Sequence, residues 1–263
     1  MVCAAMERPD AIDLQPMLRA GARQPTAARR RYRIRGLVKV ETLFLDAGGV
    51  LINPNFERVA DALRAHGVPA EGAALRGAEA HAKKELDTDT IVTATNDAAR
   101  GWLYFELVLK HAGIARDERT AAALKDLAAY HAEHNLWETV PDEVPAALER
   151  LRAGGRRLAV LSNANGTVSR LFARLGLQGH FDHVLDSWVE KVEKPDPRFF
   201  TLALARASAD PATTLHVGDL YHVDVRGARA AGLEAWLFDV AGLYPEADCP
   251  RVASLTELAD RLA

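Results

Sequence analysis

The spacing of hydrophobic and polar residues changes twice along the 263-residue chain. Residues 40–45 (VETLFL) form a short apolar run that ends at Asp46 and a glycine pair, which indicates a buried strand. From residue 56 to about residue 134, apolar residues recur three and four positions apart and the segments end at glycine or proline, which predicts helices. After residue 141, helical patterns alternate with short apolar runs. The pattern thus predicts a strand, a block of helices and an alternating region.

The alternating region predicts a parallel sheet. Further strands are expected at residues 157–161, 183–185, 214–217 and 235–238. Because helical patterns separate these strands, right-handed crossovers should join them, and the expected fold class is α/β with a doubly wound parallel sheet. The helical block interrupts this sheet after its first strand. We therefore expect an α/β core made of residues 38–54 and 138–263, with an inserted α-helical cap at residues 55–137.

Composition and charge narrow the function classes. Hydrophobic residues make up 49% of the chain, and 33 basic residues stand against 36 acidic ones, for a net charge of −3. This balance predicts a globular protein that binds neither nucleic acid nor a membrane surface, and no apolar run approaches the length of a membrane span. Two cysteines are too few for a disulfide framework or a cysteine zinc site, which favours a cytoplasmic location. We expect a small-molecule partner and a monomer or homodimer.

The first 37 residues differ from the rest. They include the basic run RRRYRIR at residues 29–35 and lack the apolar segment of a secretion signal. A short charge run is more often solvated than functional, so we predict a disordered N-terminal extension rather than a targeting or RNA-binding arm.

Polar residues that could carry chemistry follow the predicted strands. They are Asp46, Ser162, Asn163, Lys194, Asp219 and Asp224. The carboxyl ends of parallel strands meet at one edge of a sheet, so these side chains are expected to share a crevice. Carboxylates bind hard divalent cations, here Mg²⁺, and the metal and Lys194 would neutralise a bound phosphate. One carboxylate could then attack phosphorus in line and form an aspartyl-phosphate that water hydrolyses.

Each of these residues alone is also typical of a turn or a helix cap, but four motifs occur in order. FLDAGGVL at residues 44–51 resembles D-x-D-G-[TV], and AVLSNANG at 159–166 resembles a strand followed by [ST]-N. KPDPRFF at 194–200 resembles K-P-D-P, and HVGDLYHVDVRGARAAG at 216–232 resembles G-D-x(3)-D followed by an Ala-Gly helix. Over residues 40–263 the chain resembles the haloacid dehalogenase-like (HAD) hydrolase superfamily, in its branch with a helical cap after the first strand.

The resemblance implies roles for the matching positions. Asp46 corresponds to the nucleophile, while Ser162, Asn163 and Lys194 correspond to the residues that bind the phosphoryl group. The implied Mg²⁺ ligands are Asp46, the carbonyl of Gly48, Asp219 and Asp224. The function implied is that of a magnesium-dependent phosphatase acting on a small phosphorylated metabolite.

One position departs from the family pattern. Phosphatases of the family carry a second Asp two residues after the nucleophile as general acid and base, and here that position is Gly48. Losing a general acid costs about 10²–10⁴-fold in rate, so the hydrolase activity is expected to be weak. The main alternative is therefore a catalytically weak or inactive protein of the same fold that binds a phosphorylated ligand or partner.

Two further alternatives are less favoured. A 2-haloacid dehalogenase would lack the acidic pair Asp219 and Asp224. A phosphonatase-type hydrolase would use a lysine of the cap, but we interpret Lys83 and Lys84 as a solvated helix face. The histidines at 131 and 134 are interpreted as a solvated or packed pair rather than metal ligands.

Overall fold

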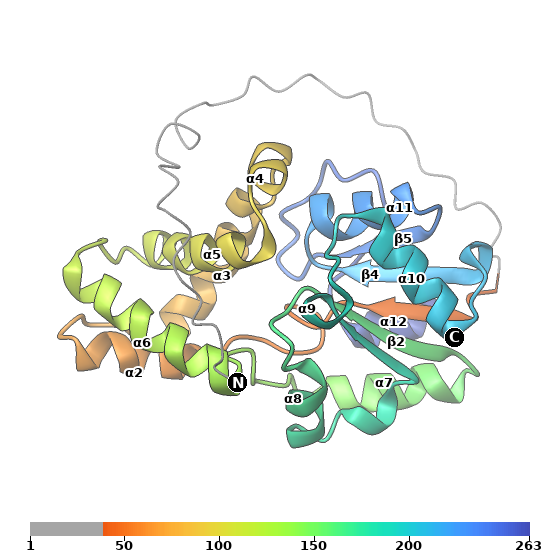
Figure 1. The fold of residues 1–263 in the computed structure, drawn as a ribbon, viewed down its shortest axis with the longest axis horizontal. Helices are drawn as coiled ribbons and strands as arrows, with labels where there is room; N and C mark the ends of the chain where they lie inside the picture. The colour runs from red at the N-terminus through yellow and green to blue at the C-terminus, as the bar shows by residue number, and fades with distance from the viewer. Residues whose placement is uncertain (1–38) are drawn as a thin grey trace.

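The computed structural model describes residues 39–263, and the predicted N-terminal extension at residues 1–37 lies outside the described residues (Figure 1). A six-stranded sheet with the strand order β3-β2-β1-β4-β5-β6 forms its centre, and every neighbouring pair is parallel. The strands are β1 (Thr42–Leu45), β2 (Arg157–Ser162), β3 (His183–Asp186), β4 (Thr214–Gly218), β5 (Glu234–Phe238) and β6 (Arg251–Val252). This topology confirms the predicted doubly wound α/β fold.

Both faces of the sheet are buried, because successive residues of a strand point to opposite sides. Leu43 and Leu45 of β1 belong to one apolar cluster, and Phe44 between them belongs to another. The first cluster includes residues of α7 (Val144–Ala153), α8 (Val168–Arg174) and α12 (Leu255–Arg261). The second includes residues of α10 (Pro197–Ala207) and α11 (Arg226–Ala230). The continuous apolar run of β1 is therefore explained by helices on both sides.

Between β1 and α7 the chain forms five helices, which we call the helical insert. They are α2 (Phe56–Ala65), α3 (Gly72–Leu86), α4 (Asp89–Ala94), α5 (Asp97–His111) and α6 (Glu118–His134). Their apolar faces form a separate cluster that includes Leu63, Leu75, Val108 and Leu127. Polar side chains start these helices: Asn96 caps α5, and Asp117 begins α6 with a capping box.

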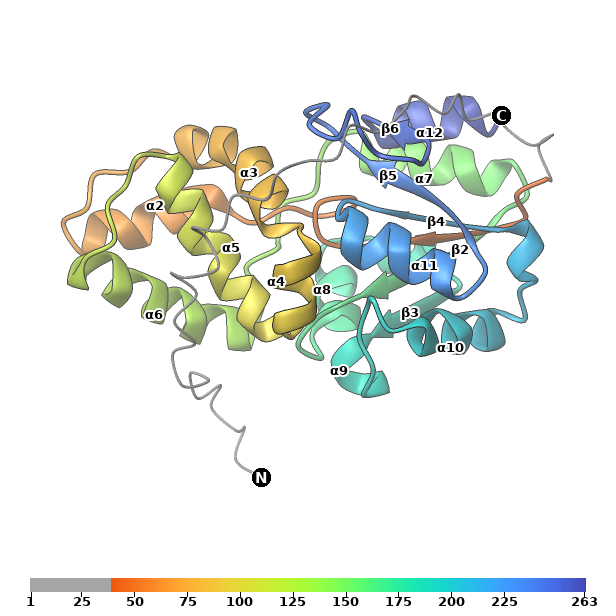
Figure 2. The ribbon, with the colours of Figure 1, turned by 90° about the horizontal axis from the view of Figure 1, so that it is seen from above.

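The helical insert lies beside the carboxyl ends of the strands (Figures 1 and 2). The chain passes from one part to the other in the loops after β1 and after α6, where Asn53 pairs with Thr139 across an isolated bridge. Two short segments follow sheet strands at the same edge: the one-turn α9 (Ser187–Glu190) after β3, and a π-helical segment at Tyr221–Val225 after β4. Within residues 39–263, the helices are too short or too polar to cross a membrane.

Candidate active site

The ends of the central strands bring the predicted acidic residues together. Asp46 follows β1, Asp219 follows β4, and Asp224 lies in the π-helical segment after it. One carboxylate oxygen from each of the three lies within 4.8 Å of the others. Because β1 pairs with both β2 and β4, Ser162 and Asn163 end on the same edge of the sheet. The predicted crevice is thus formed by loops from three adjacent strands.

Lys194 lies at the centre of this cluster. Its Nζ is 2.8 Å from Asp46 Oδ1 and 2.8 Å from Asp224 Oδ1, and its side chain is 1% exposed. The Asn163 side chain fixes the Lys194 backbone, because Nδ2 donates to the Lys194 carbonyl at 2.9 Å and Oδ1 accepts from the Lys194 amide at 2.8 Å. Ser162 is buried beside them, with its Oγ 3.4 Å from the Asn163 carbonyl. Asn163 is therefore a positioning residue for Lys194 through its side chain.

The carboxylates crowd one another. Burial raises the pKa of Asp46 above its usual range, and the charges of Asp224 and Asp219 add to this effect while Lys194 opposes it. Burial raises the pKa of Asp219 as well. Burial would do the same to Asp224, but Lys194 and His216, whose Nε2 lies 3.0 Å from Asp224 Oδ1, hold its pKa well below the usual range. A cation bound by these oxygens would relieve this repulsion, and an all-oxygen donor set suits Mg²⁺.

Two glycines after Asp46 allow close approach of other groups. Gly49 has a φ of +73°, and a Cβ there would lie 2.0 Å from Asp219 Oδ2. Only glycine fits this conformation and this contact without strain. At Gly48, a Cβ would lie 3.2 Å from Trp137 Nε1, so an indole from the chain after α6 covers the space above this position. The structure therefore places an aromatic ring next to the position where the family's phosphatases carry the general acid.

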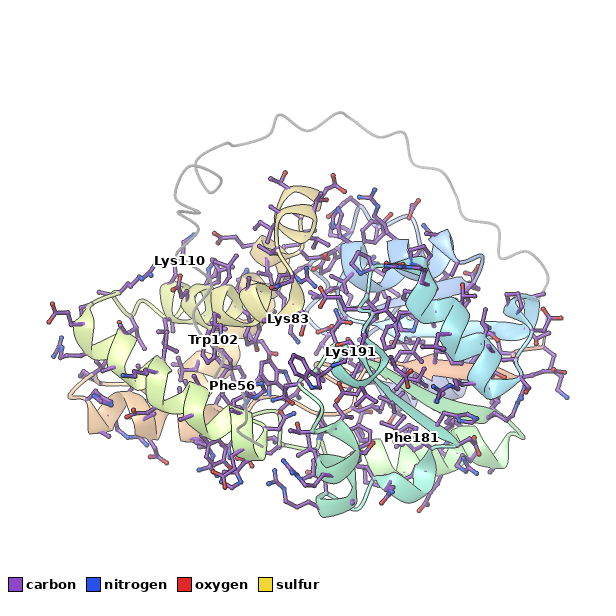
Figure 3. The ribbon with its side chains drawn as sticks, in the orientation of Figure 1. Phe56, Lys83, Trp102, Lys110, Phe181 and Lys191 are labelled. Atoms are coloured by element: carbon purple, nitrogen blue, oxygen red, sulfur yellow. The ribbon has the colours of Figure 1, made fainter. Side chains whose placement is uncertain are left out.

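Lys83 differs from its sequence interpretation. Its Nζ lies 2.8 Å from Asp219 Oδ2 and 2.8 Å from Glu79 Oε1, and its side chain is only 20% exposed. Figure 3 places Lys83 at the boundary between the helical insert and the sheet. The interpretation as a solvated face was wrong for Lys83 because α3 points its last turns at the carboxyl edge of the sheet. Lys84 instead pairs with Glu246 and lies over the Tyr244 ring at 3.9 Å.

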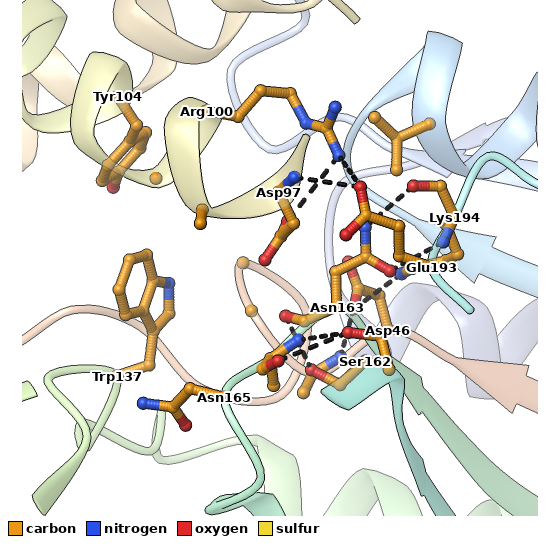
Figure 4. A pocket seen from close by; sticks show the side chains of 18 of the residues that line it. Asp46, Asp97, Arg100, Tyr104, Trp137, Ser162, Asn163, Asn165, Glu193 and Lys194 are labelled. Carbon is orange, nitrogen blue, oxygen red and sulfur yellow. Dashed lines mark hydrogen bonds and ion pairs between the residues drawn. The ribbon is translucent and has the colours of Figure 1, made fainter. Parts of the chain in front are cut away.

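A cavity of about 460 Å³ lies between the sheet edge and the helical insert, and the candidate residues Asp46, Ser162, Lys194 and Asp219 line it (Figure 4). The insert and the chain after it contribute aromatic rings, with Trp137 5.9 Å from Tyr104 and 5.5 Å from Phe105 between ring centroids. The insert also contributes the polar side chains of Asp97 and Arg100. Sequence reasoning did not single out Trp137, Asp97 or Arg100, because no motif marks them.

The histidines have separate roles in the structure. His131 lines the cavity, packs on Trp137 and accepts a hydrogen bond from the Leu136 amide at Nδ1, at 3.1 Å. Burial lowers the pKa of His131 to about 4, so the ring is neutral at pH 7. His134 lies beside Tyr130 instead. Among the described residues, the one cluster suited to a metal is the carboxylate group of Asp46, Asp219 and Asp224.

Comparison with known proteins identifies the class to which this fold and site belong. The haloacid dehalogenase-like hydrolase family matches residues 40–232, which is most of the chain. The chain therefore belongs to this hydrolase family, and the resemblance drawn from the four motifs is confirmed.

Individual relatives agree with the family. The human haloacid dehalogenase-like hydrolase domain-containing protein 3 is 32% identical over 191 residues, covering 71% of this chain and 76% of the relative. A ribulose-1,5-bisphosphate 5-phosphatase from Halopiger xanaduensis is 37% identical over 185 residues, covering 69% and 71%. The structure of a HAD-hydrolase from Bacillus subtilis bound to magnesium matches with a TM-score of 0.62 at 18% identity, over 85% of this chain and 99% of that one. At this identity the last similarity concerns the fold alone.

Proposed function

We propose that the protein is a magnesium-dependent phosphatase that acts on a small phosphorylated metabolite through an aspartyl-phosphate at Asp46. The observation that carries the proposal is the position of Asp46, which lines the cavity. Lys194 Nζ lies 2.8 Å from the carboxylate of Asp46 and 2.8 Å from that of Asp224. Phosphatases among the relatives, including the one that acts on ribulose-1,5-bisphosphate, support the reaction class.

The residues at the sheet edge would have different roles in the reaction. Asp46 would attack phosphorus, since its carboxylate follows β1 and lines the cavity beside Lys194. Lys194 and the Ser162 hydroxyl would bind the oxygens of the phosphoryl group, with the Asn163 amide as a helper. Asp46, the Gly48 carbonyl, Asp219 and Asp224 would hold Mg²⁺, with Asp224 in direct contact or just behind. When bound, the cation would neutralise phosphoryl charge and keep Asp46 ionised.

The helical insert would act as a cap over the site. Asp87, between α3 and α4, accepts hydrogen bonds from the Tyr221 and His222 amides at 2.6 and 2.8 Å, and Asn135 donates to Thr167 at 2.8 Å. These contacts hold the insert against the loops of the sheet, where it would limit the access of bulk water to a bound substrate. Water exclusion strengthens the electrostatic interactions of a bound phosphate.

The alternative is a protein that binds a phosphorylated ligand without turnover, and Gly48 is the observation that favours it. One experiment separates the two. Hydrolysis of p-nitrophenyl phosphate is measured with and without Mg²⁺ for the native chain, Asp46→Asn and the control Asp142→Asn, an exposed carboxylate outside the cavity. We expect Mg²⁺-dependent turnover that Asp46→Asn abolishes and Asp142→Asn retains.

Calorimetry then tests the metal. Mg²⁺ should bind the native chain and Asp142→Asn but not Asp219→Ala, which removes one of the three carboxylates. Phosphate binding without turnover in every variant would support the alternative, and an unchanged isotherm for Asp219→Ala would remove the metal assignment.

A further inference from the structure

The cavity contains an acidic side chain that the proposed function has not used. Asp97 is the first residue of α5 and lines the cavity from the side of the helical insert. Gly48, which lines the same cavity, cannot supply a proton, and Trp137 covers it. In Figure 4 the Asp97 carboxylate points from the insert into the cavity, toward Asn163 and Asp46.

The backbone at the start of α5 is fixed. The Asn96 side chain caps the helix by accepting from the Ala99 amide at 2.9 Å. The Asp97 amide donates to Glu193 Oε1 at 3.0 Å, so the insert is anchored next to Lys194. The cavity that Asp97 lines also contains Asn163 and Lys194, the residues that would bind the phosphoryl group.

The position of Asp97 in the cavity raises the pKa of its carboxyl group, although the side chain is 36% exposed and the nearby cations oppose the shift. Burial raises the pKa of Asp97 and Asp186 adds to this, while Arg100 and Lys194 oppose it. Arg100 Nη2 lies 3.8 Å from Asp97 Oδ1 and 3.5 Å from Glu193 Oε1, so two carboxyl groups share one guanidinium. Burial raises the pKa of Glu193 as well. Two acids beside one cation do not both ionise easily.

We propose that Asp97 is the general acid and base of this enzyme, supplied by the helical insert in place of the missing side chain at Gly48. The inference rests on the proposed phosphatase function. As the Asp46 oxygen forms its bond to phosphorus, the bond from phosphorus to the leaving-group oxygen breaks, and that oxygen takes the proton of Asp97. In the second half, Asp97 accepts a proton from the water that attacks the phosphoryl group, phosphate is released and Asp46 is regenerated.

Other groups near the cavity are less suited to this role. Lys83 is held by Asp219 and Glu79, and these charges raise its pKa against the effect of burial, so it keeps its proton. His131 is neutral at pH 7. His222 donates its amide to Asp87 and does not line the cavity.

The test compares two leaving groups. Butyl phosphate needs its alkoxide oxygen protonated, whereas p-nitrophenyl phosphate releases a stable phenolate. Asp97→Asn keeps the shape of the side chain, and we expect it to lower kcat/KM for butyl phosphate by about 10²–10⁴-fold and for p-nitrophenyl phosphate by less than about 10-fold. Asp97→Glu, which keeps a carboxyl group, should recover part of the lost activity. The control Asp89→Asn changes the first residue of α4, which pairs with Arg226 on the surface, and should match the native chain.

The pH profile gives a second readout. Native activity on butyl phosphate should fall as the pH rises and Asp97 loses its proton, and Asp97→Asn should lack this fall. Equal losses on both substrates would show a structural role and overturn the proposal, as would no loss on either. If the native chain hydrolyses p-nitrophenyl phosphate through Asp46 but does not hydrolyse butyl phosphate, Asp97 is no acid although the phosphatase assignment stands. If it hydrolyses neither, the phosphatase assignment itself fails.

Discussion

The sheet edge and the helical insert line the same cavity but hold their side chains differently. At the sheet edge, Lys194, Asp224 and His216 form a buried chain of hydrogen bonds and ion pairs, and Asp46 joins it from β1. In the insert, Lys83 and Asp97 reach the cavity from helix positions that have no sequence motif. The sheet edge therefore holds the motif residues in one buried network, and the insert adds charged groups that no motif marks.

The two regions also depend on each other through charge. Lys83 from α3 reaches Asp219, and Arg100 from α5 reaches Glu193, so basic residues of the insert neutralise acids of the sheet part. Such pairs contribute more when they are shielded from water than on the surface. The site is therefore complete only when the insert is docked on the sheet.

The largest expected effect concerns Gly49 at the sheet edge. An alanine there would place its Cβ 2.0 Å from Asp219 Oδ2 and 2.6 Å from Lys83 Nζ, at a φ of +73°. We expect Gly49→Ala to destabilise the fold by about 2–5 kcal/mol, from backbone strain and overpacking together, and to abolish Mg²⁺ binding. Gly67→Ala is the matched control, because its φ is +72° and its Cβ would meet nothing within 4 Å. Urea denaturation and calorimetry of the two variants separate strain from the clash, and equal behaviour would contradict the contact with Asp219.

A second prediction concerns His131 in the insert and the pH dependence of stability. Its folded pKa of about 4 lies below the usual value of 6.5, so the unfolded chain binds the proton more readily. Above pH 6.5 the ring is neutral in both states and the free energy of unfolding has its full value. As the pH falls from 6.5 toward 4, the unfolded chain takes up the proton first, so the free energy of unfolding decreases. Between pH 7 and pH 5 the free energy of unfolding should drop by about 2 kcal/mol from this group. Urea denaturation at both pH values measures this drop in the free energy of unfolding.

His131→Asn keeps an acceptor for the Leu136 amide and should remove this share of the pH dependence. His134→Asn, three residues later, should leave it unchanged. An equal pH dependence in all three proteins would show that His131 is not held neutral by the fold.

The sheet could be predicted from the sequence for a physical reason. Strands such as residues 157–161 are buried on both faces and are therefore continuously apolar, and the crossover rule fixes how such strands pair. Because parallel strands end at one edge, the same pattern predicts that Asp46, Ser162 and Asp219 share a crevice. The two-residue strand β6 escaped prediction, because Arg251–Val252 is too short to show a pattern.

The insert side of the site could not be predicted in the same way. Helical periodicity indicates the helices, but it does not tell which face of α3 or α5 meets the sheet. Lys83 and Lys84 are neighbours of the same type, yet one contacts Asp219 and the other Glu246. The spacing of Glu79 and Lys83 by one helical turn was a signal that both could share one face. No sequence pattern predicts that Trp137 covers Gly48, because this contact arises only from tertiary packing.

The smallest expected effect tests the contact between the two regions at Lys83. Its charge lies 2.8 Å from Asp219 Oδ2 and would compete with the proposed Mg²⁺ for that oxygen. Lys83→Met keeps the length of the side chain, and removing the charge should tighten Mg²⁺ binding about tenfold, or about 1.4 kcal/mol. Because the pair is shielded from solvent, the gain should change little with added salt. Lys84→Met is the matched control, since its ion pair with Glu246 lies outside the cavity. Calorimetric titration of the three proteins measures the difference, and unchanged or weaker Mg²⁺ binding in Lys83→Met would show that the insert does not oppose the metal at Asp219.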